Sequence, residues 1–311
     1  MKDRRLRRLH SAAFDYFVAV VQEGSFRSAA RRLGVAASAI NRHILLLEIE
    51  LGFVLFDRKA RGLKLNEAGE ILYRHCTTTA RSFEDALEQL DALRELRRGV
   101  VRVAASESFA AEIVPEICAD FNDIYPGIRL NVIVAGTDTV VASVASDESD
   151  VGFAFGNTAP PGVRIVSAVD LPIGAVVGAK HPLARRKKVS LRDCLKYPLL
   201  IPDSRLSFRR RIDEISDIFS SRQTPGIEAT SPRLMIGIAR MNRHVTFQTY
   251  IGITDDLARG TFVFLPLTDK KLKPDHCMII ASARSRGRFA AERFCSFASE
   301  ALSRKLGSVA T

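Results

Sequence analysis

Residues 25–50 carry the sequence SFRSAARRLGVAASAINRHILLLEIE, which predicts two short helices joined by a tight turn. Ser25 is a suitable N-cap for the first helix, and Gly34 offers the tolerance of positive φ that its end requires. The second helix is expected from about Ala37 to Glu50. Its apolar residues recur at helical spacing: Ile40, Ile44, Leu47 and Leu51. A helix–turn–helix of this kind presents its second helix to the major groove of DNA.

The sequence on both sides of this stretch extends the same prediction. An amphipathic helix before it carries Phe14, Phe17, Val18 and Val21, and ends at Gly24. After it, two short apolar runs around the basic loop at residues 58–62 predict a β-hairpin wing. A long helix is then expected from Asn66 to Arg97. Its apolar stripe favours pairing with a second copy over packing on its own chain: Leu72, Cys76, Phe83, Leu87, Leu90 and Leu93.

Charge is concentrated in the same region. The 311-residue chain has a formal net charge of +11, and residues 1–64 hold 13 Lys and Arg against 6 Asp and Glu. A local excess of positive charge suits the neutralisation of phosphates, although a basic surface also serves solubility. No apolar run approaches the ~20 residues of a membrane span. The basic start is followed by Asp15 and no cleavage site, so we expect a cytoplasmic protein without membrane contact.

The five cysteines are scattered without a C-x-x-C pair, which predicts neither a zinc site nor a disulfide framework. Buried free thiols in a reducing compartment are the expected case, and a redox sensor built from two of them is the alternative.

From Val100 the chain alternates predicted strands and helices, as in doubly wound α/β folds. The helices are expected at residues 107–125 and 137–145. The strands are expected at residues 100–105, 128–135, 150–155, 171–179, 199–201, 244–248 and 278–283.

The first 69 residues resemble the DNA-binding domain of LysR-type transcriptional regulators. The matching residues include Gly24-Ser25-Phe26, Ala29-Ala30, Leu47-Glu48, Leu51-Gly52, Leu55-Phe56-Asp57-Arg58 and Leu65-Asn66-Glu67-Ala68-Gly69. Pro126-Gly127, His181-Pro182-Leu183-Ala184 and Tyr197-Pro198-Leu199 extend the resemblance more loosely towards the C-terminus.

The resemblance implies three parts: a winged helix–turn–helix at residues 1–65, a dimerising linker helix at 66–98 and an effector-binding domain at 99–311. The effector domain resembles periplasmic binding proteins, with lobe I at about 99–168 and 269–311 and lobe II at about 169–268. Crossovers between the lobes are expected near residues 168–170 and 266–268. The implied partners are operator DNA, a small-molecule effector such as a carboxylate, RNA polymerase, and further copies in a homodimer or homotetramer.

Two departures from the family pattern bear on specificity. The family's Ser-Gln-Pro-Ala before the recognition helix is Ala36-Ala37-Ser38-Ala39 here, and a following Ser is Asn41. Asn suits bidentate contact with adenine, whereas Ala37 offers only apolar contact. A family pattern rich in glycine appears here at residues 242–249 as NRHVTFQT, so the ligand pocket is expected to have a different lining on that side.

The candidate DNA-binding residues lie on the two helices and the wing. Asn41 and Arg42 are the expected base readers, with phosphate contact as the alternative for Arg42. His43 is expected at the DNA backbone or in solvent. The full set is Arg27, Arg31, Arg32, Ser38, Asn41, Arg42, His43, Arg58, Lys59, Arg61 and Lys64.

Most candidate effector-binding residues lie where predicted strands end and helices begin, because free backbone N–H groups converge there. The other four, Phe153, Phe155, Thr246 and Gln248, lie on predicted strands that are expected to form the floor of the pocket. Hydroxyls at the helix starts either cap helices only or also contact a ligand. The set is Ser106, Glu107, Ser108, Thr137, Phe153, Phe155, Asp203, Ser204, Thr230, Ser231, Thr246 and Gln248.

The sequence shows no catalytic, nucleotide-binding or metal-ligand motif, so we expect no enzyme activity, no cofactor and no metal. The predicted function is a DNA-binding transcriptional regulator controlled by an effector between two lobes. The alternative is a small-molecule-binding module whose specific DNA binding is weak or lost.

Overall fold

The computed structural model describes residues 12–59, 62–92, 99–156, 158–204, 206–215, 226–285 and 288–309. The chain separates into two compact units, Met1–Leu93 and Arg94–Thr311, each with its own hydrophobic core. None of the described helices is long and apolar enough to cross a membrane.

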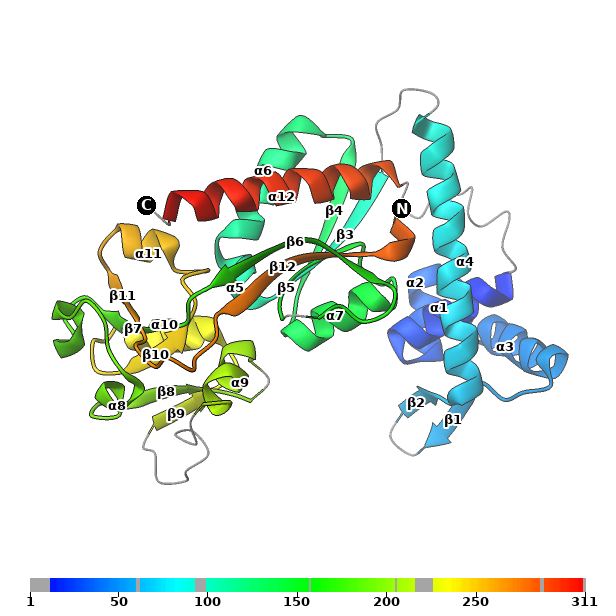
Figure 1. The fold of residues 1–311 in the computed structure, drawn as a ribbon. Coiled ribbons are helices and arrows are strands. Elements are labelled where there is room, and N and C mark those ends of the chain that lie inside the picture. The colour runs from blue at the N-terminus through cyan, green and yellow to red at the C-terminus, as the bar shows by residue number, and fades with distance from the viewer. Residues whose placement is uncertain are drawn as a thin grey trace. The chain divides into compact units, whose positions relative to one another are not determined.

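The first unit begins with three helices, α1 (Ala12–Glu23), α2 (Phe26–Leu33) and α3 (Ala37–Leu51) (Figure 1). Apolar side chains from all three helices meet in one core, which includes the fully buried Phe17 and Ile40. Gly34 ends α2 with a φ of 68°, a conformation that favours glycine. Ser25 occupies the N-cap position of α2, but its side chain makes no capping hydrogen bond.

A two-stranded antiparallel wing follows, formed by β1 (Phe56–Lys59) and β2 (Gly62–Leu65). The side chain of Asn66 joins the wing to the next helix, because it accepts from the backbone N–H of Gly69 at 2.9 Å and donates to the carbonyl of Val54 at 2.8 Å. A Cβ on Gly69 would lie 2.2 Å from the carbonyl oxygen of Leu55, so only glycine fits there.

The long helix α4 spans Glu67–Ala92 in the described part of the chain. Cys76 is 5% exposed and Leu72 is half-buried, and both pack in the core of their own unit. The prediction that these two residues belong to a dimerisation stripe is therefore wrong. Residues 93–97, the side chains of Leu87 and Leu90, and Leu93 lie outside the described residues.

The second unit contains two five-stranded sheets, each at the centre of one lobe (Figure 1). The lobe I sheet has the order β4-β3-β5-β12-β6, where β3 is parallel to β4 and β5, and β12 is antiparallel to β5 and β6. Its strands are β3 (Gly99–Ala105), β4 (Ile128–Val134), β5 (Val151–Phe155), β6 (Val163–Leu171) and β12 (Asp275–Ser282).

Helices cover both faces of the lobe I sheet. Side chains of α5 (Glu107–Ala111), α6 (Ile113–Ile124) and α12 (Phe289–Val309) share one core with the sheet. Side chains of α7 (Thr137–Ala145) form a separate cluster with the sheet. Because β5 lies in the middle of the sheet between these layers, all five of its residues are buried.

The lobe II sheet has the order β11-β7-β10-β8-β9. Its strands are β7 (Gly174–Gly178), β8 (Leu199–Pro202), β9 (Gly226–Ala229), β10 (Val245–Gln248) and β11 (Phe262–Pro266). The lobe II helices are α8 (Leu191–Cys194), α9 (Ser207–Asp213), α10 (Pro232–Ala239) and α11 (Thr254–Ala258). Short 3₁₀ turns, η2 (Pro182–Arg185) in lobe II and η4 (Ala283–Ser285) after β12, complete the described elements.

The structure corrects several predicted boundaries. The single helix predicted at residues 107–125 divides at Glu112, whose φ of −141° and ψ of −56° interrupt the helix. The first crossover predicted at 168–170 lies inside β6, and the chain passes between the sheets at residues 172–173. The second crossover occupies residues 267–274, immediately after β11. The strands β6, β9 and β11 were not predicted.

Candidate functional site

The exposed face of α3 carries Ser38, Asn41 and Arg42. Ile40, Ile44 and Leu47 anchor the opposite face of this helix in the core. Within the described part of the chain, the side chains of Asn41 and Arg42 have no hydrogen-bond or ion-pair partner. Their donors and acceptors are therefore available to a ligand outside the domain.

The arginines of α2 differ in how far they are already engaged. Arg32 donates to Glu23 and to Gln22, both at 2.8 Å, so its guanidinium is held by its own chain. Arg31 makes a long 3.4 Å contact with Ser28, and Arg27 is exposed. Arg32 is thus the predicted phosphate ligand that the structure supports least.

His43 does not lie with the exposed residues of α3. It is half-buried, and its ring stands edge-on to Tyr16 with 5.2 Å between ring centroids. This contact gives His43 a packing role that the sequence did not predict. On the wing, Lys64 is exposed and Arg58 and Lys59 lie on β1, whereas Arg61 lies outside the described residues.

The second unit has a cavity of about 290 Å³ between its lobes. Lobe I contributes the ends of β3 and β4 and the starts of α5 and α7, and lobe II contributes the starts of α9 and α10. Seven predicted effector-binding residues are among its lining: Ser106, Glu107, Ser108, Thr137, Phe155, Thr230 and Ser231. The hydroxyl of Ser106 is buried there without a hydrogen-bond partner in the described structure. A buried hydroxyl without a partner is costly, so this atom is suited to bind a ligand.

A larger neighbouring cavity of about 710 Å³ shares Thr137, Phe155 and Ser207 with the first one. It adds the basic residues Arg210 and Arg211 and the buried Asp275. Ser207 of α9 donates to Asp275 at 2.6 Å. Burial raises the pKa of the Asp275 carboxyl, while the bond from Ser207 and the nearby Arg211 oppose that rise.

Polar side chains join the lobes beside these cavities. Ser231 donates to Glu107 at 2.9 Å, and Glu112 accepts from the hydroxyl of Thr254 at 2.6 Å and from its backbone N–H at 2.9 Å. The sequence prediction included Glu107 and Ser231 but missed Glu112, whose partner lies 142 residues further along the chain.

The structure does not bring every predicted effector-binding residue to a cavity. Phe153 and Thr246 are fully enclosed at 0% exposure, Phe153 in the lobe I core and Thr246 beside the sulfur of Met235. Asp203 and Ser204 line neither of the two cavities among the described residues. Gln248 lines a different cavity, between α5, α10 and α11.

The cysteines in the described structure are all free. Burial raises the pKa of the Cys76 and Cys295 thiols to about 11 and that of Cys194 to about 12, and it also raises the pKa of Cys118 and Cys277. No cluster of metal-ligating side chains occurs among the residues that the structure describes.

The first unit is a winged helix–turn–helix whose exposed α3 side chains, Asn41 and Arg42, have no partner in the described chain. The second unit has two α/β lobes with a cavity between them. Together these features define the class of ligand-responsive DNA-binding regulators. Residues 12–70 match the model of the bacterial regulatory helix–turn–helix proteins of the lysR family, and residues 94–303 match that of the LysR substrate binding domain. The chain belongs to the LysR family of transcriptional regulators.

Relatives and solved structures agree with this assignment. The chain is 27% identical to the uncharacterized HTH-type transcriptional regulator YbhD of Escherichia coli, over 59% of this chain and 58% of the relative. It therefore spans less than two thirds of that relative's length. It is 26% identical to a probable RuBisCO transcriptional regulator of Trichormus variabilis, over 89% of this chain and 83% of the relative.

Two full-length structures show the same fold. One is a single-residue variant of OxyR from Pseudomonas aeruginosa, with a TM-score of 0.65, 19% identity and 94% of both chains covered. The other is CbnR in complex with its target DNA, with a TM-score of 0.62, 18% identity, and 93% of this chain and 98% of that chain covered.

Proposed function

We propose that α3 reads a specific operator through Asn41 and Arg42. The observation that supports this is the exposure of both side chains without partners in the described chain. Asn pairs in bidentate fashion with adenine, and Arg with guanine or a phosphate. Arg27, Arg31 and Lys64 are exposed on the neighbouring elements and suit phosphate contacts, which position a protein on DNA without specifying sequence.

The test is DNase footprinting on DNA upstream of the protein's own and neighbouring genes, at physiological salt so that non-specific binding is weak. A protected pseudo-palindrome with half-sites about one helical turn apart, or a multiple of it, supports a homodimer or homotetramer. Titration of the protected site then compares Asn41→Ala and Arg42→Ala with Arg32→Ala. The first two lose about tenfold to hundredfold in affinity. Arg32→Ala changes affinity little, because its guanidinium is engaged by Glu23 and Gln22.

Protection that disappears with competitor DNA contradicts operator recognition. It favours the alternative, a small-molecule-binding module without specific DNA binding. Equal affinities for Arg42→Ala and wild type, at a site that is protected, remove Arg42 from the contact set while leaving the regulator intact.

We infer further that the 290 Å³ cavity between the lobes is the effector site and that it favours a carboxylate. The unpartnered hydroxyl of Ser106 and the first backbone N–H groups of α7, at Thr137, are donors suited to an anion. A ligand here contacts elements of both lobes and so biases the distance between them. Bacterial cytoplasm, where DNA and RNA polymerase are present, is the compartment that this function requires.

The effector proposal is tested by titration calorimetry, since the chain contains no Trp whose fluorescence could report binding. A panel of small carboxylates is titrated into wild type and Ser106→Ala. A carboxylate that binds wild type about tenfold more tightly than the variant and shifts operator affinity supports the site. Binding of uncharged analogues with equal affinity contradicts the anion preference.

A further inference from the structure

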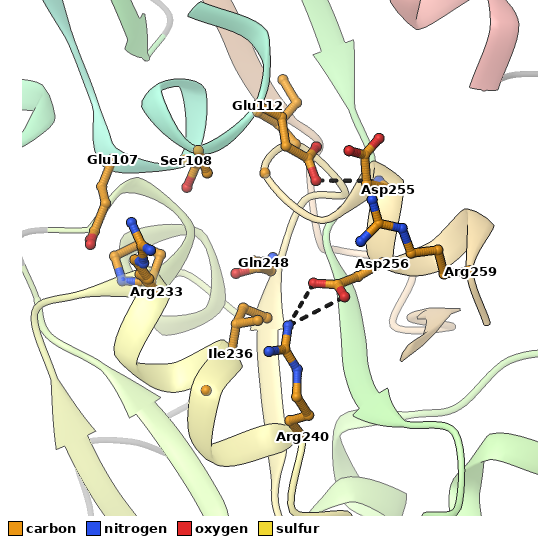
Figure 2. Close-up of a pocket in the computed structure, with 15 residues that line it drawn as sticks. Glu107, Ser108, Glu112, Arg233, Ile236, Arg240, Gln248, Asp255, Asp256 and Arg259 are labelled. Carbon is orange, nitrogen blue, oxygen red and sulfur yellow. Dashed lines mark hydrogen bonds and ion pairs between the residues drawn. The ribbon is translucent and has the colours of Figure 1, made fainter. Parts of the chain in front are cut away.

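A third cavity of the second unit, of about 420 Å³, lies between α5 of lobe I and α10 and α11 of lobe II (Figure 2). It shares Glu107, Ser108 and Pro232 with the proposed effector cavity, so the two are neighbours. The rest of its lining is separate and carries charges of both signs. A ligand in it would touch both lobes without occupying the effector cavity.

Gln248 is the first reason to assign a ligand to this cavity. Its side chain is 3% exposed, and its Oε1 atom is buried without a hydrogen-bond partner among the described residues. Figure 2 shows its amide in the middle of the cavity, with Glu107 and Arg233 towards one side and Asp255 and Asp256 towards the other. Since nearly all buried acceptors in folded proteins have a donor, this carbonyl calls for an N–H or O–H group from a bound molecule.

The arginines that line the cavity differ in whether they already have a partner. Arg240 is engaged, because it donates to Asp256 at 3.0 and 3.3 Å and its guanidinium lies 5.6 Å from the ring centroid of Phe262. Arg233 is exposed, and its side chain has no partner in the described part of the chain. A free guanidinium at the edge of a cavity is suited to bind a carboxylate in a bidentate arrangement.

The carboxylates that line the cavity also differ in whether they can accept a further hydrogen bond. Oε1 of Glu107 accepts from Ser231, which leaves its second carboxylate oxygen for another donor. Both carboxylate oxygens of Glu112 are engaged at the start of α11, where they accept from Thr254 and from the backbone N–H of Asp255. Asp255 and Arg259 also line the cavity without a side-chain partner in the described structure, but Figure 2 shows them together on the side of Gln248 away from Glu107. On the Glu107 side, the available groups are two acceptors, Glu107 and Gln248, and one cation, Arg233.

We propose that this cavity is a second small-molecule site and that it binds an amino acid. The ammonium group donates to Gln248 Oε1 and to Glu107, and the carboxylate pairs with Arg233. Because Glu107 belongs to lobe I and the other two residues to lobe II, the bound amino acid holds the lobes together at a point beside the effector cavity.

The experiment is a thermal-shift screen of the full-length protein with the protein L-amino acids, each assayed separately, followed by calorimetry on those that bind. The matched amine without the carboxylate and the matched 2-hydroxy acid without the ammonium are titrated as controls. We expect at least one amino acid to bind, with both controls about tenfold weaker or more. Failure of every amino acid to bind overturns the proposal.

Three variants locate the site. Gln248→Met removes the acceptor at nearly constant shape, and Arg233→Gln removes the cation; each weakens amino-acid binding about tenfold or more. Without ligand, Gln248→Met melts no lower than wild type, because it removes an unsatisfied buried group, so loss of folding cannot account for its effect. Arg240→Gln is the matched control, since Arg240 lines the same cavity but its guanidinium is already engaged by Asp256, and amino-acid binding remains near the wild-type level.

Thr137→Val distinguishes the amino-acid site from the effector cavity, because Thr137 lines the effector cavity and does not line the amino-acid cavity. Amino-acid binding lost in Thr137→Val but kept in Gln248→Met overturns the second site and assigns the amino acid to the effector cavity. Operator footprinting of the same proteins is independent of both results, so failure of this proposal is distinct from failure of the proposed DNA-binding function.

Discussion

Ser231, the N-cap of α10, donates a hydrogen bond from its hydroxyl to the Glu107 carboxylate of α5 at 2.9 Å, and so joins lobe II to lobe I. The same hydroxyl accepts from the backbone N–H of Leu234 at 3.1 Å and caps α10. Ser231 lines the proposed effector cavity, and Glu107 lines both that cavity and the proposed amino-acid cavity. This hydrogen bond is therefore the point at which a change in either cavity can alter the contact between the lobes.

Ser231→Ala should lower the free energy of unfolding of the second unit by about 1–2 kcal/mol, because it removes both the α10 cap and the hydrogen bond to a charged group. Thr230→Ala is the matched control, since Thr230 is exposed and makes no side-chain hydrogen bond in the described structure. Urea denaturation of both variants measures the difference. Equal stabilities for the two variants would show that neither the α10 cap nor the Ser231–Glu107 contact stabilises the unit.

The sequence predicted the helices and strands that carry both a clear apolar repeat and residues that mark their ends. Helix α3 was predicted to within a residue because its apolar residues repeat at helical spacing and Gly34 and Gly52 bracket it. The three missed strands, β6, β9 and β11, all lie at sheet edges. Their pairing depends on partners distant in sequence, and β6 and β9 mix charged or polar residues with apolar ones, so they lack the continuous apolar run that identified the central strands. The sequence of β11 is an apolar run of the kind that predicts a strand, and it was missed.

The candidate site, too, could be predicted only where the local sequence pattern places a residue. Helix starts predicted Ser106 and Thr137 correctly as cavity-lining residues, because strand ends and helix starts meet at one edge of a sheet. Phe153 was misplaced since β5 is buried on both faces, so alternation along the strand does not show which side faces a cavity. Glu112 and Arg233 could not be found from the sequence, because their importance comes from elements that only the tertiary fold brings near.

Two Gly→Ala substitutions should change stability in opposite directions. Gly69→Ala should destabilise the first unit by about 1–3 kcal/mol, since the new Cβ would lie 2.2 Å from the Leu55 carbonyl oxygen and 2.7 Å from the Leu65 side chain. Gly237→Ala should stabilise the second unit by about 0.5–1 kcal/mol, because Gly237 lies within α10 and no atom beyond its neighbours and the helix's own backbone lies within 4 Å of the added methyl group. Thermal melts of both variants test the pair, and a neutral Gly69→Ala would contradict the close packing of α4 on the wing.

The thiols of the native protein should react slowly with a disulfide reagent at neutral pH. Burial raises the pKa of each cysteine, to about 11 for Cys76 and Cys295 and about 12 for Cys194, so the reactive thiolate is scarce. Cys118 is only half-buried and should be the first to react. Mass spectrometry after timed labelling identifies the modified residue, with urea-unfolded protein as the fully reactive control. Rapid labelling of two buried thiols, or a disulfide formed by mild oxidant, would instead support the redox-sensor alternative.

Asp275 should make the second unit less stable as pH rises from acid towards neutral. Burial raises the pKa of this carboxyl in the folded state, so the folded state binds the proton more tightly than the unfolded chain does. The resulting stabilisation is complete below the ordinary Asp pKa and is lost as pH rises through the folded-state pKa. Asp275→Asn should therefore melt higher than wild type at neutral pH, and the difference should vanish in acid.

Ser207 supplies the control for this pH dependence, because its hydroxyl donates to the Asp275 carboxylate at 2.6 Å and stabilises the ionised form. Ser207→Ala should raise the pKa of Asp275 further and extend the loss of stability to higher pH. Melting temperatures of wild type and both variants across the acid-to-neutral range test this order. Parallel curves for wild type and Asp275→Asn would mean that Asp275 does not change its protonation on unfolding, and the buried carboxyl would then have to be compensated by Arg211 and His276.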